Sequence, residues 1–272
     1  MARLRGYENN VGRFVADTGI DWYEWPTLSE LKSLWRALPG GAVSTPFQTP
    51  EFVHAFSRNI ASQICERFAV LGLRGKATQD PVMLLPLVWS RKGPFRIVSF
   101  PDFGLSDQNG PVLSKEFAAA PNLQMQNLVS NLTSVLPECD VLKICKIPST
   151  IEGYSNPLFT ATEATQHSQN FCMDAECLQH VGSSKKSVYK EARSKFRKLE
   201  REGVSLFEAK SAEEREAICS ALLAQRKQRE DAAGETNTIG EGYRADFFKA
   251  LAGLNSKTSP VVALALRKGD EI

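Results

Sequence analysis

The stretch Ser183–Gly203, SSKKSVYKEARSKFRKLEREG, predicts one long helix around which the rest of the chain is arranged. A serine at its start can accept an unpaired backbone N–H. Gly203 can end it, because glycine takes the left-handed conformation at no steric cost. Apolar residues recur every three or four positions and form a single stripe: Val188, Ala192, Phe196 and Leu199. The pattern predicts a helix that packs by one face.

The other positions of this helix are strongly basic. It holds eight Lys or Arg residues and three Glu residues, so it carries +5, whereas the whole chain carries only +2. Two interpretations stay open: a solvated helix, or a basic face that binds an anionic ligand. The pI near 8.2 makes the positive charge local, which disfavours a protein that coats nucleic acid.

The composition is that of a soluble globular protein. A chain of 272 residues can form one large or two ordinary domains. The longest apolar run, Pro81–Trp89, is far shorter than the roughly twenty residues of a membrane span. The first residues have no apolar core behind their arginines, so they do not form a secretory signal. We expect a cytoplasmic protein without a membrane span.

The six cysteines do not predict a metal site. Their one suggestive grouping is Cys172, Cys177 and His180, whose spacing is looser than that of zinc pairs and which no second pair follows. We expect reduced structural thiols and no bound metal.

The same order of elements is predicted twice. After Gly203 come a strand, a helix that opens with the capping box of Ser211 and Glu214, a second helix, and another strand. The same strand–helix–helix–strand order starts near Trp22 and is followed by further strands. The chain then ends two residues into an expected return strand at Glu271, so we expect a fragment whose second domain is incomplete.

Four segments in this order resemble the GNAT acetyltransferase superfamily in tandem form. They are TPFQTPEF at 45–52, LLPL at 84–87, FPDFGLSD at 100–107 and SKFRKLEREG at 194–203. The closest resemblance is to the CelD-like acetyltransferases, which are relatives of the FemAB peptidyltransferases. It implies an α/β (α+β) fold of tandem GNAT-like domains, with mixed central sheets flanked by helices and a second domain truncated at its C-terminus.

The resemblance also implies a division of the chain and a reaction. Residues 1–20 would form a leader, residues 21–180 the first domain, and residues 181–272 the linking helix with the front half of the second domain. The implied reaction moves an acyl group from acetyl-CoA or another acyl-CoA to a small-molecule or saccharide amine, as in polysaccharide or cell-envelope metabolism.

In GNAT domains the acyl-CoA lies where two parallel strands splay apart. Its pyrophosphate binds at a helix N-terminus, and a strand amide polarises the acyl carbonyl. The usual Gly-rich phosphate signature is absent from this chain. We therefore expect the cofactor site largely in a part of the second domain beyond residue 272.

The candidate substrate-binding residues come from one loop and two helices. The loop 101–111 is rich in Gly, Pro, Asp and Asn, so it predicts either a site or simply a series of turns. An Asp in a cleft can orient or deprotonate an amine if burial raises its pKa. The candidates are Asp102, Asp107, Arg193, Arg197 and Arg229. No catalytic residue is assigned.

Two other functions stay open. One is FemAB-type aminoacyl transfer, with the basic helix touching tRNA. It is disfavoured because only about fifty residues separate the strands at 204 and 260, too few for the long helical arm of such enzymes. The other is a non-catalytic GNAT-like interaction module.

Overall fold

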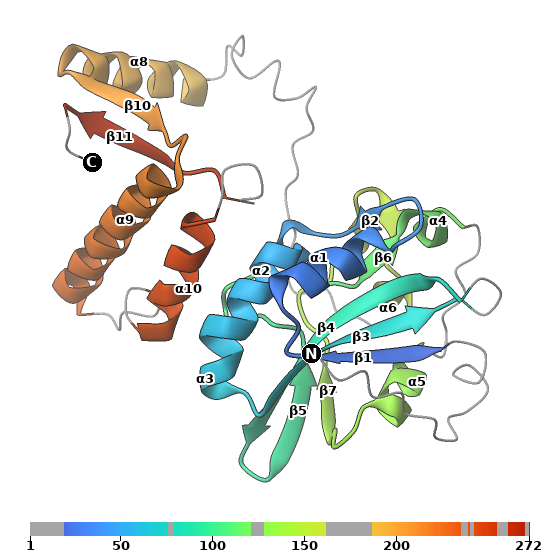
Figure 1. Cartoon of the computed structure of the whole chain (residues 1–272). Helices are drawn as coiled ribbons and strands as arrows, with labels where there is room; N and C mark the ends of the chain where they lie inside the picture. The colour runs from blue at the N-terminus through green and yellow to red at the C-terminus, as the bar shows by residue number, and fades with distance from the viewer. Residues whose placement is uncertain are drawn as a thin grey trace.

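A computed structural model shows a mixed α/β (α+β) chain with a mixed sheet and helices, which confirms the α/β (α+β) part of the predicted fold class (Figure 1). It describes residues 19–75, 79–120, 128–161, 187–234, 239, 242–254, 261–269 and 272. The predicted leader and the grouping of Cys172, Cys177 and His180 lie outside these residues, apart from the last two leader positions.

A seven-stranded mixed sheet forms the centre of the first unit, with its main strands in the order β1-β3-β4-β5-β7. Its strands are β1 Ile20–Glu24, β2 Ala42–Val43, β3 Arg67–Arg74, β4 Pro81–Lys92, β5 Phe95–Ser99, β6 Val112–Ser114 and β7 Val141–Lys143. Neighbours pair antiparallel except β5 and β7, which are parallel. A crossover from β5 to a parallel β7 must pass along the sheet, and it contains α4 (Lys115–Ala118) and α5 (Leu128–Val135).

Both faces of the sheet are covered, which explains why β4 is an almost continuous apolar run. Along this strand Leu84 and Val88 belong to one core, whereas Leu85 and Leu87 belong to the other. Pro86 lies between two partner segments. On the side away from β3, β4 pairs with β6 up to Leu84 and with β5 from Val88 onward. A residue without an N–H is tolerated in such a gap.

One face carries α1 (Leu28–Arg36), α2 (Pro50–Phe56), the π-helical turn η2 (Ser57–Ala61) and α3 (Ser62–Ile64). The other face carries α5 and the short helix α6 (Pro157–Thr160). Thr49 as N-cap and Pro50 at the first helical position predict a single helix from residue 49 to about residue 64. The structure interrupts it by the π turn, which periodicity does not reveal.

The second unit has an order of elements similar to that at the start of the first. It consists of α8 Ser187–Arg201, β10 Val204–Glu208, α9 Ala212–Ala233, α10 Gly242–Ala252 and β11 Leu264–Lys268. β10 pairs antiparallel with β11, as β1 does with β3. In both units a five-residue strand is followed, three residues after its end, by a helix N-cap within a capping box. The two N-caps are Thr27 and Ser211.

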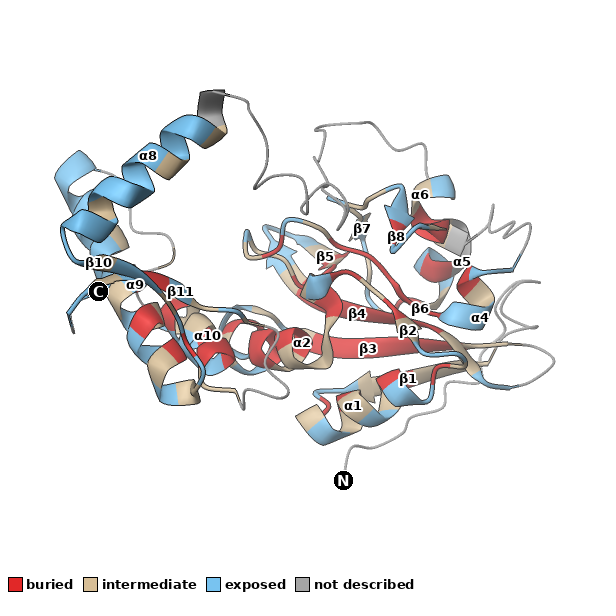
Figure 2. Ribbon diagram, turned by 90° about the horizontal axis from the view of Figure 1, so that it is seen from above, coloured by how far each residue is buried: buried red, intermediate tan, exposed pale blue. Residues whose placement is uncertain are grey.

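Helix α10 of the second unit is buried on the first unit. Phe247 and Leu251 belong to the same core as Phe52 and Phe56, and α10 packs against α2 and η2. The rings of Phe52 and Phe247 lie 5.2 Å apart at 84°. Figure 2 shows the buried surface continuing from α2 into α10. The second helix of each unit therefore packs against its counterpart.

The β10–β11 sheet is covered on one face. Phe207 and Ala265 pack with Ile218 of α9. The opposite face carries Leu206 and Leu266, which are paired across the strands and both exposed.

The basic helix α8 is confirmed over its described residues. It ends at Arg201, before Gly203, whose φ is +80° as the sequence predicted. It packs against β10, and most of its side chains are exposed. No helix in the described ranges combines the length and the apolar character that crossing a bilayer requires.

Candidate functional site

Polar groups gather where the parallel strands β5 and β7 end. Because the strands are parallel, the loop after Ser99 and the segment after Lys143 leave the sheet at the same edge. Asn109 joins them: its backbone N–H donates to the Lys146 carbonyl at 2.9 Å, and its side-chain amide donates to the Cys145 carbonyl at 3.1 Å. We call Asp102, Ser106, Asn109 and Lys146 the strand-end cluster.

The strand-end cluster is internally hydrogen-bonded. The Lys146 ammonium lies 2.9 Å from an Asp102 carboxylate oxygen and 2.8 Å from the Ser106 carbonyl, to which it donates. The Ser106 hydroxyl donates to the Asn109 side-chain oxygen at 2.7 Å, and both residues are only 2% exposed. Buried polar groups with complete partners hold a loop rigidly. Phe103 and Lys146, both with positive φ, are held in that conformation here.

Asp102 is an anion in this cluster. Burial alone raises the pKa of its carboxyl group, but several contacts outweigh it: the hydrogen bond and charge of Lys146, and donation from the Gly104 N–H and the Asn109 amide. The pKa of Asp102 therefore lies below its ordinary value. The condition for a general base, a pKa raised by burial, is not met at Asp102.

The other predicted site residues are spread over three elements. Asp107 is exposed on the same loop, Arg193 and Arg197 lie on α8, and Arg229 lies near the end of α9. Arg193 is half-buried, whereas Arg197 and Arg229 are exposed. Figures 1 and 2 both show α8 set apart from the seven-stranded sheet. The structure therefore brings Asp102 and Asp107 together on one loop, and does not bring the two α8 arginines to it.

Arg244 at the start of α10 reaches this loop. Its Nη1 lies 3.9 Å from the point that a Cβ on Gly104 would occupy, and Gly104 has a φ of +82°. Phe103 and Leu105 pack against the core that holds Tyr243 and the rest of α10. Three segments distant in sequence thus meet: the loop 100–111, the segment 144–148 and the start of α10.

Sequence reasoning missed Lys146, Asn109 and Arg244. The parallel arrangement of β5 and β7 would have indicated Lys146, because it places the segment after each strand at one edge. Asn109 was within the candidate loop but looked like an ordinary turn residue. Arg244 had no local signal, since its position depends on the packing of α10 on the other unit.

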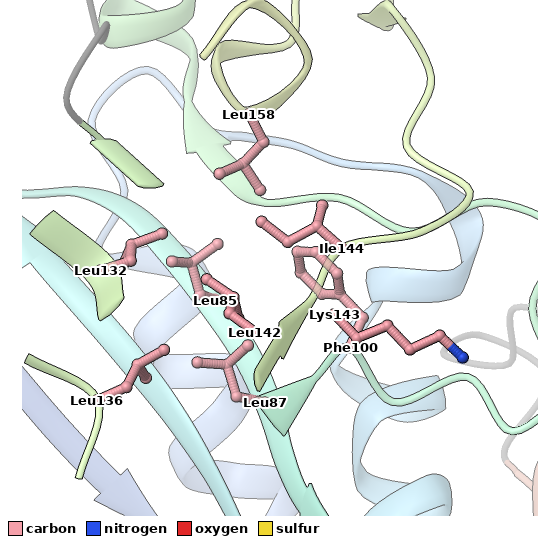
Figure 3. A pocket seen from close by; sticks show the side chains of 9 residues that line it. All are labelled: Leu85, Leu87, Phe100, Leu132, Leu136, Leu142, Lys143, Ile144 and Leu158. Atoms are coloured by element: carbon pink, nitrogen blue, oxygen red, sulfur yellow. The ribbon is translucent and has the colours of Figure 1, made fainter. Parts of the chain in front are cut away.

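A small apolar cavity lies on the α5 face of the sheet (Figure 3). It measures about 10 Å³, roughly the space of a single water. Its walls are Leu85, Leu87, Phe100, Leu132, Leu136, Leu142, Lys143, Ile144 and Leu158. Phe100 and Ile144 are the first residues after the paired parts of β5 and β7. Side chains therefore fill the space beside the strand ends, and no acyl chain fits there.

Comparison with known proteins gave no match. No protein-family model matches the chain, and no curated protein or solved structure resembles it at a significant level. Within the residues that the structure covers, no group of three or more His, Cys, Asp or Glu side chains could hold a metal ion.

Proposed function

We propose that the protein is an N-acyltransferase of the GNAT type, related to the CelD-like enzymes, which moves an acyl group from acyl-CoA to an amine. One observation carries the proposal. An antiparallel sheet in the order β1-β3-β4-β5 is completed by one parallel strand, β7, reached through a helical crossover. Strands β5 and β7 pair over only three positions before both leave the sheet. A parallel pair of strands that separates after a short paired stretch is characteristic of the GNAT fold, and the GNAT domains that bind acyl-CoA hold it there.

The repeat supports the tandem form of this proposal. The β10-α9-α10-β11 order, the equally spaced capping boxes and the contact between equivalent helices all fit two copies of one plan. A pair of equivalent elements that contact each other is what a pseudo-twofold arrangement produces.

The residues of the first unit do not fit acyl-CoA. A pyrophosphate needs free N–H groups and a free cation. Here the Gly104 N–H and the Lys146 ammonium already donate to Asp102. The cavity beside the strands is too small for a pantetheine arm. In the second unit, the described strands β10 and β11 are antiparallel and offer no such parallel pair. In the proposed reaction, the first unit therefore binds the amine acceptor and not acyl-CoA.

Thiol release tests this function. The full-length protein would be incubated with acetyl-CoA and a panel of amines that includes amino sugars, and free CoA thiol would be measured. We expect release that depends on both the protein and an amine. The absence of release, together with no calorimetric heat from acetyl-CoA at high micromolar concentration, would contradict it.

A second candidate function is a non-catalytic GNAT-like interaction module, and the occupied donors around Asp102 favour it. Asp102 already accepts from the Gly104 N–H and the Lys146 ammonium, the donors that a cofactor phosphate would need. In both candidate functions the first unit therefore binds a molecule without catalysing its reaction. Retained partner binding without thiol release would distinguish this candidate.

A further inference from the structure

Helix α10 holds Arg244 in a fixed place. Its neighbour Tyr243 and, one turn on, Phe247 and Phe248 lie in or against the core that also contacts Phe103 and Leu105. The rings of Phe247 and Phe248 are 5.3 Å apart. Arg244 is therefore anchored against the loop by packing on both sides of it.

Among the residues that the structure describes, Arg244 has no counter-charge. Its side chain is half-buried, and within the described chain it makes neither an ion pair nor a hydrogen bond. A guanidinium that is partly removed from water without a partner costs free energy. The nearby Asp102 is not available, because Lys146 already pairs with it.

The loop that faces Arg244 has a glycine, Gly104, at the position nearest to the guanidinium. Gly104 has no side chain, and its positive φ turns the backbone so that a Cβ there would meet Arg244. Asp107, three residues further along the same loop, is exposed and has no partner in the described chain. Within the described chain, an unpartnered cation, Arg244, thus lies beside Gly104, and an unpartnered carboxylate, Asp107, lies on the same loop as Gly104.

We infer that Arg244 binds an oxyanion, carboxylate or phosphate, carried by the amine acceptor. This inference rests on the proposed acyltransferase function. The planar guanidinium can donate two parallel hydrogen bonds to either oxyanion. The free Asp107 carboxylate favours an acceptor ligand over the donor, because it attracts the ammonium group of an amine and repels the phosphates of CoA.

The test is an anion titration without any acyl donor. Inorganic phosphate and acetate would be titrated separately into the full-length protein, while the arginine Nε–Hε signals are followed by NMR. We expect the signal that is absent from Arg244→Ala to shift saturably with one of the two anions, and the anion that does so identifies the group. Arg244→Ala should weaken this binding about tenfold or more, and Arg244→Lys should weaken it less.

Arg36→Ala is the matched control, since Arg36 is exposed at the end of α1 and has no partner in the described chain. It should leave anion binding unchanged. Arg244→Ala should also keep the melting temperature, because it removes no hydrogen bond or ion pair within the described chain. The inference is overturned if neither anion saturates the signal, or if Arg244→Ala binds as well as the wild type. Anion binding without thiol release would reject the acyltransferase function and leave this site standing.

Discussion

Asp102 illustrates how a single carboxylate organises the strand-end cluster. It accepts hydrogen bonds from the Lys146 ammonium, the Gly104 N–H and the Asn109 amide. Its side chain is 19% exposed, whereas that of Lys146 is 41% exposed. Solvent therefore screens the cation more than the anion. The Asp102 carboxylate therefore stabilises the fold mainly by accepting hydrogen bonds from buried donors. The Coulombic attraction to Lys146 contributes less.

Asp102→Asn should destabilise the protein by about 1 kcal/mol at pH 7, because the donors of Lys146 and Gly104 lose a charged acceptor. The folded-state pKa of Asp102 is depressed, so its contribution is present above its unfolded pKa and is lost as pH falls through the folded value. Urea unfolding at several pH values measures both effects. The variant should lose less stability than the wild type between neutral and strongly acidic pH.

Asp107→Asn is the control for this measurement, because Asp107 is exposed on the same loop. It should change stability by less than about 0.5 kcal/mol. Equal losses from both substitutions would contradict the role given to Asp102.

The thiols of Cys65 and Cys145 should react with iodoacetamide at different rates. Burial raises the pKa of the Cys65 thiol to about 12, so almost no thiolate exists at pH 8. Cys145 is exposed beside the strand-end cluster. Mass spectrometry after brief iodoacetamide treatment should find Cys145 modified first. Labelling of Cys65 at the same rate would show that its surroundings open readily.

At the scale of elements, α1 and α9 begin in the same way. The hydroxyl of each N-cap accepts the N–H of a glutamate three residues on, at 3.2 Å for both Thr27 and Ser211. That glutamate in turn accepts the N-cap N–H, at 2.8 Å for Thr27 and 3.0 Å for Ser211. Only the box at Ser211 was recognised from the sequence.

Thr27→Ala and Ser211→Ala should each cost about 1 kcal/mol of stability, because each leaves helical N–H groups without an acceptor. Ser220→Ala, at an exposed position inside α9, should be neutral or slightly stabilising, since alanine favours helix. Chemical denaturation with circular dichroism measures all three. Equal effects at Ser211 and Ser220 would argue against the cap.

Local sequence patterns predict which helices and strands exist better than they predict the residues at which these elements end. The apolar pattern of residues 140–147 predicts one strand, but β7 stops at Lys143, and Lys146 instead donates to Asp102 in the loop. The second-unit strand predicted at 260–266 is found at Leu264–Lys268. Such limits are decided by tertiary partners, which periodicity does not contain.

At the scale of the whole molecule, the decisive contact is α10 on α2 and η2. Phe247 is fully buried between Phe52 and Phe56. The sequence predicted a helix there and its apolar residues, but it did not indicate that the partner lay about 190 residues earlier. The loop 101–111 was predictable as a candidate site from its local composition, whereas the position of Arg244 beside it was not.

Phe247→Ala should destabilise the protein by about 3–5 kcal/mol, because it opens a cavity in a core shared by both units. Leu222→Ala is the control, since Leu222 on α9 is 58% exposed and should change stability by less than about 0.5 kcal/mol. Urea unfolding followed by tryptophan fluorescence reports on the first unit, which contains all four tryptophans: Trp22, Trp25, Trp35 and Trp89. An unchanged midpoint for Phe247→Ala would contradict the shared core.

The packing of α10 on α2 and η2 also has a consequence while the ribosome synthesises the chain. The apolar surface of Phe52 and Phe56 leaves the ribosome long before Phe247, the residue that covers it. At 5–20 residues per second this delay lasts roughly 10 to 40 s. Over that interval the nascent first unit exposes a phenylalanine patch, which makes it a natural client for a chaperone that holds apolar surfaces until the chain is released.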